Sequence, residues 1–408
     1  MEKTIKKILV PIVLVIISVI FFNILNKKFN YEKKNEDQTY YKAKVKSVKN
    51  KTDEINMPKD ALNVLSPEEQ EMYKNLPKNE YQEFEAEILK VYENKNEEKE
   101  DNTKVGNVII GRREYVDKKI DKSKDIKEKD TIIIVKSAVL GQDNTYHFVS
   151  FDFSKQLVIL IVIFVALVLL IARLKGLNTI ILLFLIGYAL LKAYIPSILS
   201  GHNIYVSTML LGIYSVVIGM IIINGLNKKT YAAILGNITG LILAGILANA
   251  CNKIFNITGL SSEESMMLIR ASENKFDLKG ITWAAILIGA LGAIMDTALS
   301  IASSIREISK TTKETNFVTL FKSGMEVGKD AISTMISTLL LAYISGTLIQ
   351  SLLMSIYIKP TIFLVNSEFI LEEILKSIIG ALGILITVPA TAALAAMFEV
   401  FENRKEKR

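Results

Sequence analysis

The residues whose types and spacing could do chemistry lie in one apolar stretch, residues 289–307, which carries a single aspartate, Asp296. At helical spacing, one face collects small and polar residues: Gly289, Ala293, Asp296, Ser300, Ser303 and Glu307. An ionised carboxylate inside a membrane span is costly unless it is paired, solvated or protonated. We interpret Asp296 as a proton or cation site. The alternative is a carboxyl group that hydrogen-bonds hydroxyls on neighbouring helices and fixes their packing.

A second polar stripe follows in the next apolar stretch, where Asp330, Thr334 and Thr338 fall roughly on one side of a helix. We expect this stripe to complement the face around Asp296, although Ser and Thr in spans also bond to their own backbone. Asn237 is polar within another apolar run. The candidate transport or gating residues are therefore Asp296, Ser300, Ser303, Glu307, Asp330, Thr334, Thr338 and Asn237.

Glycines at helical spacing predict close helix packing. Gly236 and Gly240 form a GxxxG pair, which lets two helix backbones approach each other. The residues expected to serve packing are Gly289, Gly292, Gly236, Gly240, Gly380, Gly383 and Pro389. Gly380, Gly383 and Pro389 interrupt the last apolar run, where a broken helix could also expose backbone carbonyls to ions.

The elements that position these residues follow from composition. Half of the 408 residues are hydrophobic, and the mean hydropathy is +0.33. Apolar runs at 8–25, 156–172, 177–198, 203–225, 231–251, 281–303, 331–357 and 374–399 predict eight spans. We therefore expect an α-helical polytopic membrane protein with a small extracytoplasmic all-β domain. Its parts would be a signal anchor at 1–25, a soluble region at 26–154 with the β domain at about 80–153, a bundle at 155–400 and a basic tail at 401–408.

Basic residues indicate the orientation. They gather in alternate short loops, at Arg173 and Lys175, at Lys228 and Lys229, at residues 306–329 and in the tail. Because cytoplasmic loops are rich in Lys and Arg, both termini are predicted inside and residues 26–154 outside a bacterial plasma membrane. The net charge of +7 then requires no nucleic-acid partner.

Three segments resemble the YibE/F family of integral membrane proteins. They are residues 289–304, 328–343 and 380–389, and the resemblance extends over residues 80 to 400. Where the family often has Arg before the aspartate of the second segment, this chain has Lys329. The resemblance implies a multi-spanning protein with an extracytoplasmic β domain, and it implies no particular activity.

The sequence lacks the motifs that several classes of enzyme require. It contains no Walker A, HExxH or GxSxG motif and no GxGxxG after a strand, so we expect no enzyme and no cofactor. One cysteine, Cys251, and two histidines leave little material for a metal site. We expect a permease or secondary transporter with Asp296 as its coupling or gating group. The alternative is a membrane scaffold or envelope-assembly factor that recognises partners through its β domain. The expected partners are the lipid bilayer, an unknown substrate or ion, and a second copy or another membrane protein.

Overall fold

The computed structural model describes residues 2–29, 39–53, 79–92, 104–115, 124–137, 145–272, 276–311, 316–357, 362–363 and 366–406. The chain divides into two compact units. One comprises Glu32–Ala166, and the other comprises Met1–Tyr31 together with Leu167–Arg408.

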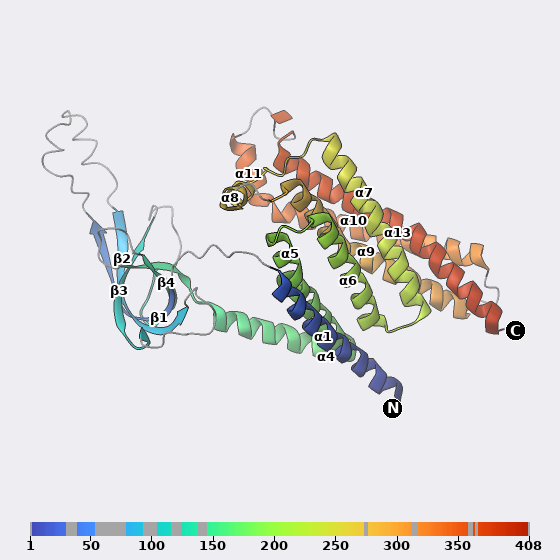
Figure 1. Cartoon of the computed structure of the whole chain (residues 1–408), viewed down its shortest axis with the longest axis horizontal. Coiled ribbons are helices and arrows are strands. Elements are labelled where there is room, and N and C mark those ends of the chain that lie inside the picture. The colour runs from blue at the N-terminus through green and yellow to red at the C-terminus, as the bar shows by residue number, and fades with distance from the viewer. Residues whose placement is uncertain are drawn as a thin grey trace. The chain divides into compact units, whose positions relative to one another are not determined.

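The smaller unit contains a closed five-stranded β-barrel (Figure 1). Its strands are β1 (Tyr40–Asp53), β2 (Asn79–Tyr92), β3 (Val108–Glu114), β4 (Thr131–Ser137) and β5 (Thr145–Phe151). They follow one another around the barrel in the order β1-β2-β3-β5-β4, and β4 pairs with β1. β3 and β5 run parallel and the other neighbours antiparallel, because β5 inserts between β3 and β4. Closure removes the free strand edges that an open sheet would expose.

β1 lies outside the range of about 80–153 expected for the β domain. Tyr41, Ala43 and Val45 are buried, and the lysines between them point away from the core. Tyr41 lies opposite Val91 of β2 in an antiparallel register. Residues 54–78 separate β1 from β2 in the chain, so the short alternation in β1 gave no sign of its partner.

An ion pair links β1 to the residue that follows β5 in the barrel. The Lys42 ammonium lies 2.5 Å from the Asp152 carboxylate, and the Ser154 hydroxyl and backbone N–H donate to the same carboxylate. The Lys42 hydrogen bond, supported by Ser154, lowers the pKa of Asp152 to about 2.

This ion pair predicts an acid-sensitive barrel. A lowered native pKa gives stability that is present above the unfolded value of about 4 and is lost as the pH falls towards 2. We expect Asp152→Asn to remove on the order of 1–2 kcal/mol at neutral pH and to flatten the barrel's stability between pH 4 and 2. Hydrogen exchange of β1 and β5 amides in the full chain measures both effects. Glu83→Gln, at the exposed pair with Lys51, is the control and should change little. Equal pH dependence in Asp152→Asn and the unmodified protein would contradict the assignment.

The larger unit is helical (Figure 1). Its elements, with α4 beginning in the smaller unit, are α1 (Glu2–Lys28), α4 (Ser154–Ala189), the π-helix η2 (Leu190–Tyr194), α5 (Ile195–Leu199), α6 (Ile204–Asn224), α7 (Lys228–Ile254), α8 (Glu263–Ser272), α9 (Leu278–Thr311), α10 (Phe317–Gly346), α11 (Leu348–Tyr357) and α13 (Glu368–Glu406). Asparagines begin three of these helices. Asn203, Asn227 and Asn316 accept hydrogen bonds from backbone N–H groups in the first turns of α6, α7 and α10.

α4 turns sharply at Arg173, whose backbone has φ 49° and ψ −126°. The turn brings Gly176 so close to Val168 that a Cβ on Gly176 would lie 2.5 Å from the Val168 carbonyl oxygen. In a continuous helix, residues eight apart are about 12 Å apart along the axis. The apolar segments expected at 156–172 and 177–198 therefore lie on either side of a real bend. Among the described residues, seven helices are long and apolar enough to cross a membrane when Ser154–Leu199 is counted as one.

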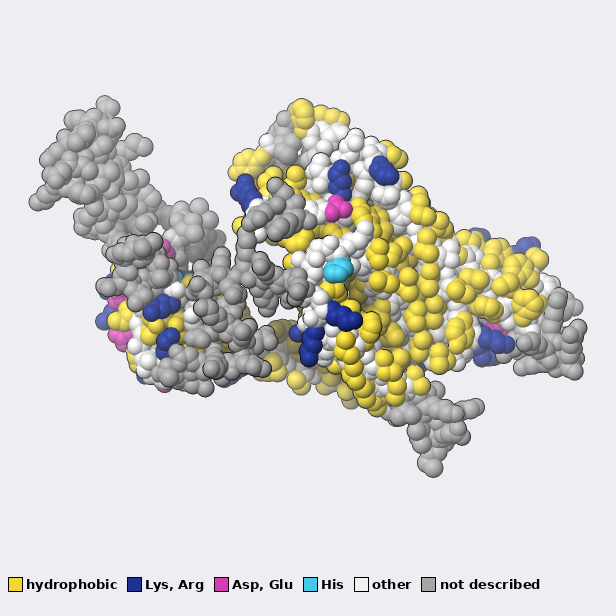
Figure 2. Space-filling model, viewed as in Figure 1, with side chains coloured by type: hydrophobic (Ala, Val, Ile, Leu, Met, Phe, Trp, Pro, Cys, Tyr) yellow, Lys and Arg dark blue, Asp and Glu magenta, His cyan; other side chains and the backbone are white. Residues whose placement is uncertain are grey.

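α9 is the central helix of the bundle and packs against α13, α7, α10 and α6. α13 also packs against α7 and α10. The core between these helices is apolar and contains small residues such as Ala244 and Ala392. Figure 2 shows hydrophobic side chains over much of the visible bundle surface. Exposed hydrophobic residues of α6 and α7 include Leu210 and Ile246. An apolar exterior of this kind suits contact with lipid.

Candidate functional site

α9 buries most of its circumference and leaves one narrow stripe exposed. Neighbouring helices cover its larger side chains, including Leu287, Ile294 and Ile301. The exposed positions repeat every three or four residues, and we name them the α9 stripe: Ala285, Gly289, Gly292, Asp296 and Ser300. Farther along the helix, Ser303 is half-buried, and the exposed Glu307 pairs with Lys310 at 2.7 Å.

Asp296 is the one carboxylate in the α9 stripe. Its side chain is exposed and makes no hydrogen bond or ion pair with any residue that the structure describes. No described hydroxyl therefore locks it in place, as the packing alternative requires. It lies about 16 Å along the helix from Ala285, eleven residues away. The arrangement leaves a carboxylate free to exchange a proton or a cation with whatever faces the stripe.

α10 presents its apolar side to α9. Leu339 and Tyr343 of α10 pack on Ala290 and Ile294 of α9. The expected polar stripe, Asp330, Thr334 and Thr338, faces away from the bundle and is exposed. Both hydroxyls donate to carbonyls of their own helix, at 3.1 Å to Ala331 and 2.9 Å to Thr334. Lys329 pairs with Glu326 at 2.8 Å. α10 thus brings none of these side chains into a hydrogen bond with Asp296.

Asn237 of α7 is fully buried in the bundle. Its side-chain nitrogen donates to the Ala233 carbonyl at 2.9 Å, and its oxygen has no partner among the described residues. The Thr391 hydroxyl oxygen of α13 is also buried without a partner in the described part of the chain. Asn237 thus stands apart from the exposed α9 stripe.

The glycines chosen for packing differ in what surrounds them. A Cβ on Gly236 or Gly240 would lie about 2 Å from Thr391 or Thr387 of α13. Gly289, Gly380 and Gly383 also have close neighbours, which are Tyr343, Leu339 and Ile294 respectively. Gly292 has open space around it. α13 continues as a helix through Pro389.

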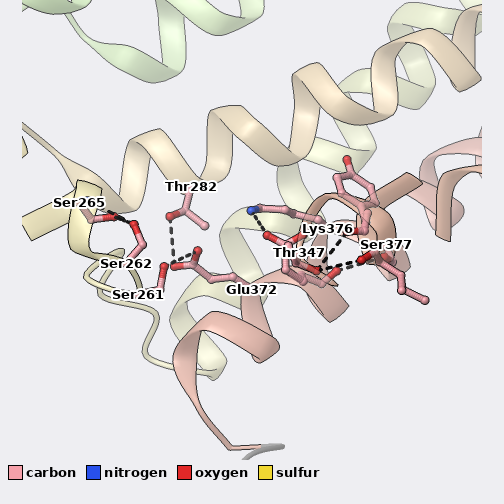
Figure 3. A network of polar contacts seen from close by, with 11 residues as sticks. Ser261, Ser262, Ser265, Thr282, Thr347, Glu372, Lys376 and Ser377 are labelled. Carbon is pink, nitrogen blue, oxygen red and sulfur yellow. Dashed lines mark hydrogen bonds and ion pairs between the residues drawn. The ribbon is translucent and has the colours of Figure 1, made fainter. Parts of the chain in front are cut away.

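A cavity of about 440 Å³ with both polar and apolar walls lies at the end of the bundle that holds α8, which we call the α8 end. The loop before α8, α8 itself, the start of α9, the junction of α10 and α11 and the start of α13 line it. Figure 3 shows Ser261 and Thr282 meeting the Glu372 carboxylate there. Glu372 is 6% exposed, and the two hydroxyls donate to it at 2.9 Å and 3.4 Å. Ala285 of the α9 stripe belongs to the same lining.

Tyr343 stands between this cavity and Asp296. Its hydroxyl lies over Gly289, where a Cβ would be 2.0 Å away, and it has no hydrogen-bond partner among the described residues. One turn farther along α10, Thr347 lines the cavity and donates to the Tyr343 carbonyl at 3.2 Å. The α9 stripe thus leads from the cavity wall, past the Tyr343 ring, to the open position at Gly292 and to Asp296.

The sequence does not predict this cavity. The last apolar run expected from the sequence begins at residue 374, so Glu372 and Glu373 lie just outside it. The signal available was a pair of acidic residues one turn before Lys376, at the start of a long apolar helix.

Long apolar helices around a central helix with a carboxylate define a helical membrane protein that carries a small β-barrel. The chain belongs to the YibE/F family, because the family model described as YibE/F-like protein matches residues 160–400. The match covers most of the helical unit, including Asp296 and Glu372, and leaves the barrel strands outside it. The resemblance was expected from about residue 80, so the matched part begins later than predicted. No curated protein and no solved structure matches the chain.

Proposed function

We propose that the protein is a permease of the bacterial plasma membrane and that Asp296 is its coupling or gating group. The observation that carries this proposal is the α9 stripe, which joins the cavity at the α8 end to an exposed carboxylate through Gly289 and Gly292. A carboxylate at this depth in a span is expensive in lipid, so its presence there favours a functional role. The Tyr343 hydroxyl lies over Gly289, between Ala285 at the cavity wall and Asp296, so movement of this ring would open the stripe to water from the cavity.

We propose that the α8 end faces the outside and that both termini are inside. With a bend at Arg173, Ser154–Leu199 supplies two spans, and the chain crosses the membrane eight times. The loops at Arg173, at Lys228 and at residues 306–329 then all lie inside, as the distribution of basic residues favours. On this topology the cavity opens to the outside, and Asp296 lies in the inner half of α9.

Thiol labelling tests whether the α9 stripe is wet. Cys251 is the only cysteine, so Cys251→Ser gives a cysteine-free protein. In that background we expect Gly292→Cys to react with a membrane-impermeant, charged thiol reagent in proteoliposomes. The space at Gly292 is open and accepts the new side chain. Leu235→Cys, on the exposed apolar side of α7, is the matched control and should stay unlabelled in lipid.

An unreactive Gly292→Cys would contradict the permease and favour a scaffold. One observation supports that second candidate. Val108 and Ile110 are exposed on β3 opposite Glu87 and Glu85 of β2. Greek-key barrels of five strands commonly use the face of strands 2 and 3 for binding. Because Lys46 pairs with Glu87 at 3.0 Å, this face is apolar with little net charge, which would suit a protein partner more than a nucleic acid.

A further inference from the structure

The cavity at the α8 end contains a buried carboxylate whose charge no described residue balances by an ion pair. Glu372 accepts hydrogen bonds from Ser261 and Thr282, which are neutral donors. Lys376, one turn away on α13, pairs with Glu373 at 2.5 Å instead. Lys376 also attracts Glu372 at longer range but forms no ion pair with it, and a buried charge without a directly bonded counter-charge is costly. The cavity beside Glu372 offers the room in which a cation would remove that cost.

The remaining lining restricts what kind of cation fits. Leu268, Leu278, Ile281 and Phe369 give the cavity an apolar side. Glu372, Glu373, Lys376 and the hydroxyls give it a polar side, on which the Lys376 charge is paired with Glu373. A volume of about 440 Å³ exceeds that of a bare ion and lies in the range of small-molecule sites. Hard divalent cations take six or more oxygen ligands, usually with several carboxylates. Among the described residues, no group of three His, Cys, Asp or Glu side chains is placed to hold a metal ion.

We propose that this cavity binds a protonated primary amine with a short apolar substituent. The ammonium group donates to Glu372 and to the hydroxyl oxygens of Ser261 and Thr282, and the substituent lies against Phe369 and Ile281. An ammonium has three donors, which matches a carboxylate flanked by two hydroxyls. As a substrate assignment this inference rests on the proposed function, but the binding site itself does not require transport.

Calorimetry on the purified full chain in lipid nanodiscs tests the ligand class. Butylammonium should bind saturably, and butanol, which has the same apolar part without the charge, should not. Sodium ions at equal ionic strength should neither bind nor compete. If butylammonium does not bind, the inference is overturned. If sodium binds in a way that depends on Glu372, the site is an inorganic cation site and the amine assignment is wrong.

Two variants locate the site. Glu372→Gln keeps the shape and removes the charge, and it should weaken butylammonium binding at least tenfold. Glu264→Gln removes an exposed carboxylate from the same lining and should change binding less than threefold. Ala285→Leu keeps every charge but fills the cavity from the α9 side, so it should also abolish binding and remains informative if Glu372→Gln fails to fold. Equal losses in Glu372→Gln and Glu264→Gln would overturn the assignment to Glu372.

A third variant separates this inference from the proposed function. Asp296→Asn lies outside the cavity lining and should still bind butylammonium saturably, even where coupling between the two sites shifts the affinity. If the protein binds butylammonium but neither it nor any variant transports, the amine site holds and the permease proposal is wrong. If transport depends on Asp296 but the unmodified protein does not bind butylammonium, the permease proposal holds and the amine site is wrong.

Discussion

Replacing Gly240 with alanine is expected to destabilise the bundle by about 1–3 kcal/mol, because the new methyl group has no space. A Cβ at this position would lie 1.9 Å from the Thr387 hydroxyl oxygen and 3.2 Å from the Gly383 carbonyl oxygen. The Thr387 hydroxyl donates to the Gly383 carbonyl at 2.7 Å, so moving it aside also strains a buried hydrogen bond. α7 and α13 would have to separate to accept the change.

Gly292→Ala is the matched control for this prediction. It is the same substitution inside another bundle helix, but nothing lies within 4 Å of the new Cβ. Alanine favours helix over glycine, so this variant should be neutral or stabilised by up to about 1 kcal/mol. Thermal unfolding in one detergent compares the two. The double variant Gly240→Ala, Thr387→Ala should recover part of the loss, and equal melting temperatures for Gly240→Ala and Gly292→Ala would show that the close contact is absent.

Gly236 and Gly240 illustrate how much of the helix packing can be predicted from residue spacing. Two glycines four residues apart predict that another helix comes close on that face. They do not say which helix, because the partner threonines of α13 are about 150 residues farther along the chain. Periodicity reports which residues share a face, whereas the identity of the neighbour depends on the packing of the whole bundle.

In the α9 stripe, too, the sequence predicts which residues share a face but not which helix lies beside them. The spacing of Gly289, Asp296 and Ser300 predicted one small and polar face, and the structure places these residues on one exposed stripe. The expected complement from α10 did not follow. Asp330 and Thr334 also share a face, but α10 has a second, apolar face with Leu339 and Tyr343, and that face packs on α9. When a helix has two coherent faces, hydrophobic burial decides which one turns inward.

Glu372 could not be found from spacing at all. Its hydroxyl partner Ser261 is 111 residues away, in a loop whose polar composition is ordinary for a membrane protein. The barrel posed a related problem, since β1 finds both of its partners across long stretches of chain. Residues near in sequence set helices and strands, but a cavity and a closed barrel are made by residues that only the fold brings together.

Replacing Asp296 with asparagine is expected to reduce proton flux through the reconstituted protein at least tenfold. The amide keeps the shape of the side chain but cannot take up or release a proton at neutral pH. Proteoliposomes with an entrapped pH indicator and an imposed potassium diffusion potential measure the flux. The stability of the bundle should not fall, because Asp296 makes no hydrogen bond or ion pair with the described residues that the change would break.

Glu307→Gln provides the control for this second prediction. Glu307 is a carboxylate on the same side of α9 as Asp296, but it lies near the end of the helix and pairs with Lys310 at 2.7 Å. Exposed pairs of this kind contribute little, so flux should change less than twofold. If both variants conduct like the unmodified protein, Asp296 is not the coupling group. If both variants lose flux equally, the loss follows from the total negative charge on this side of α9. The result would then give no support to a specific path from Ala285 to Asp296.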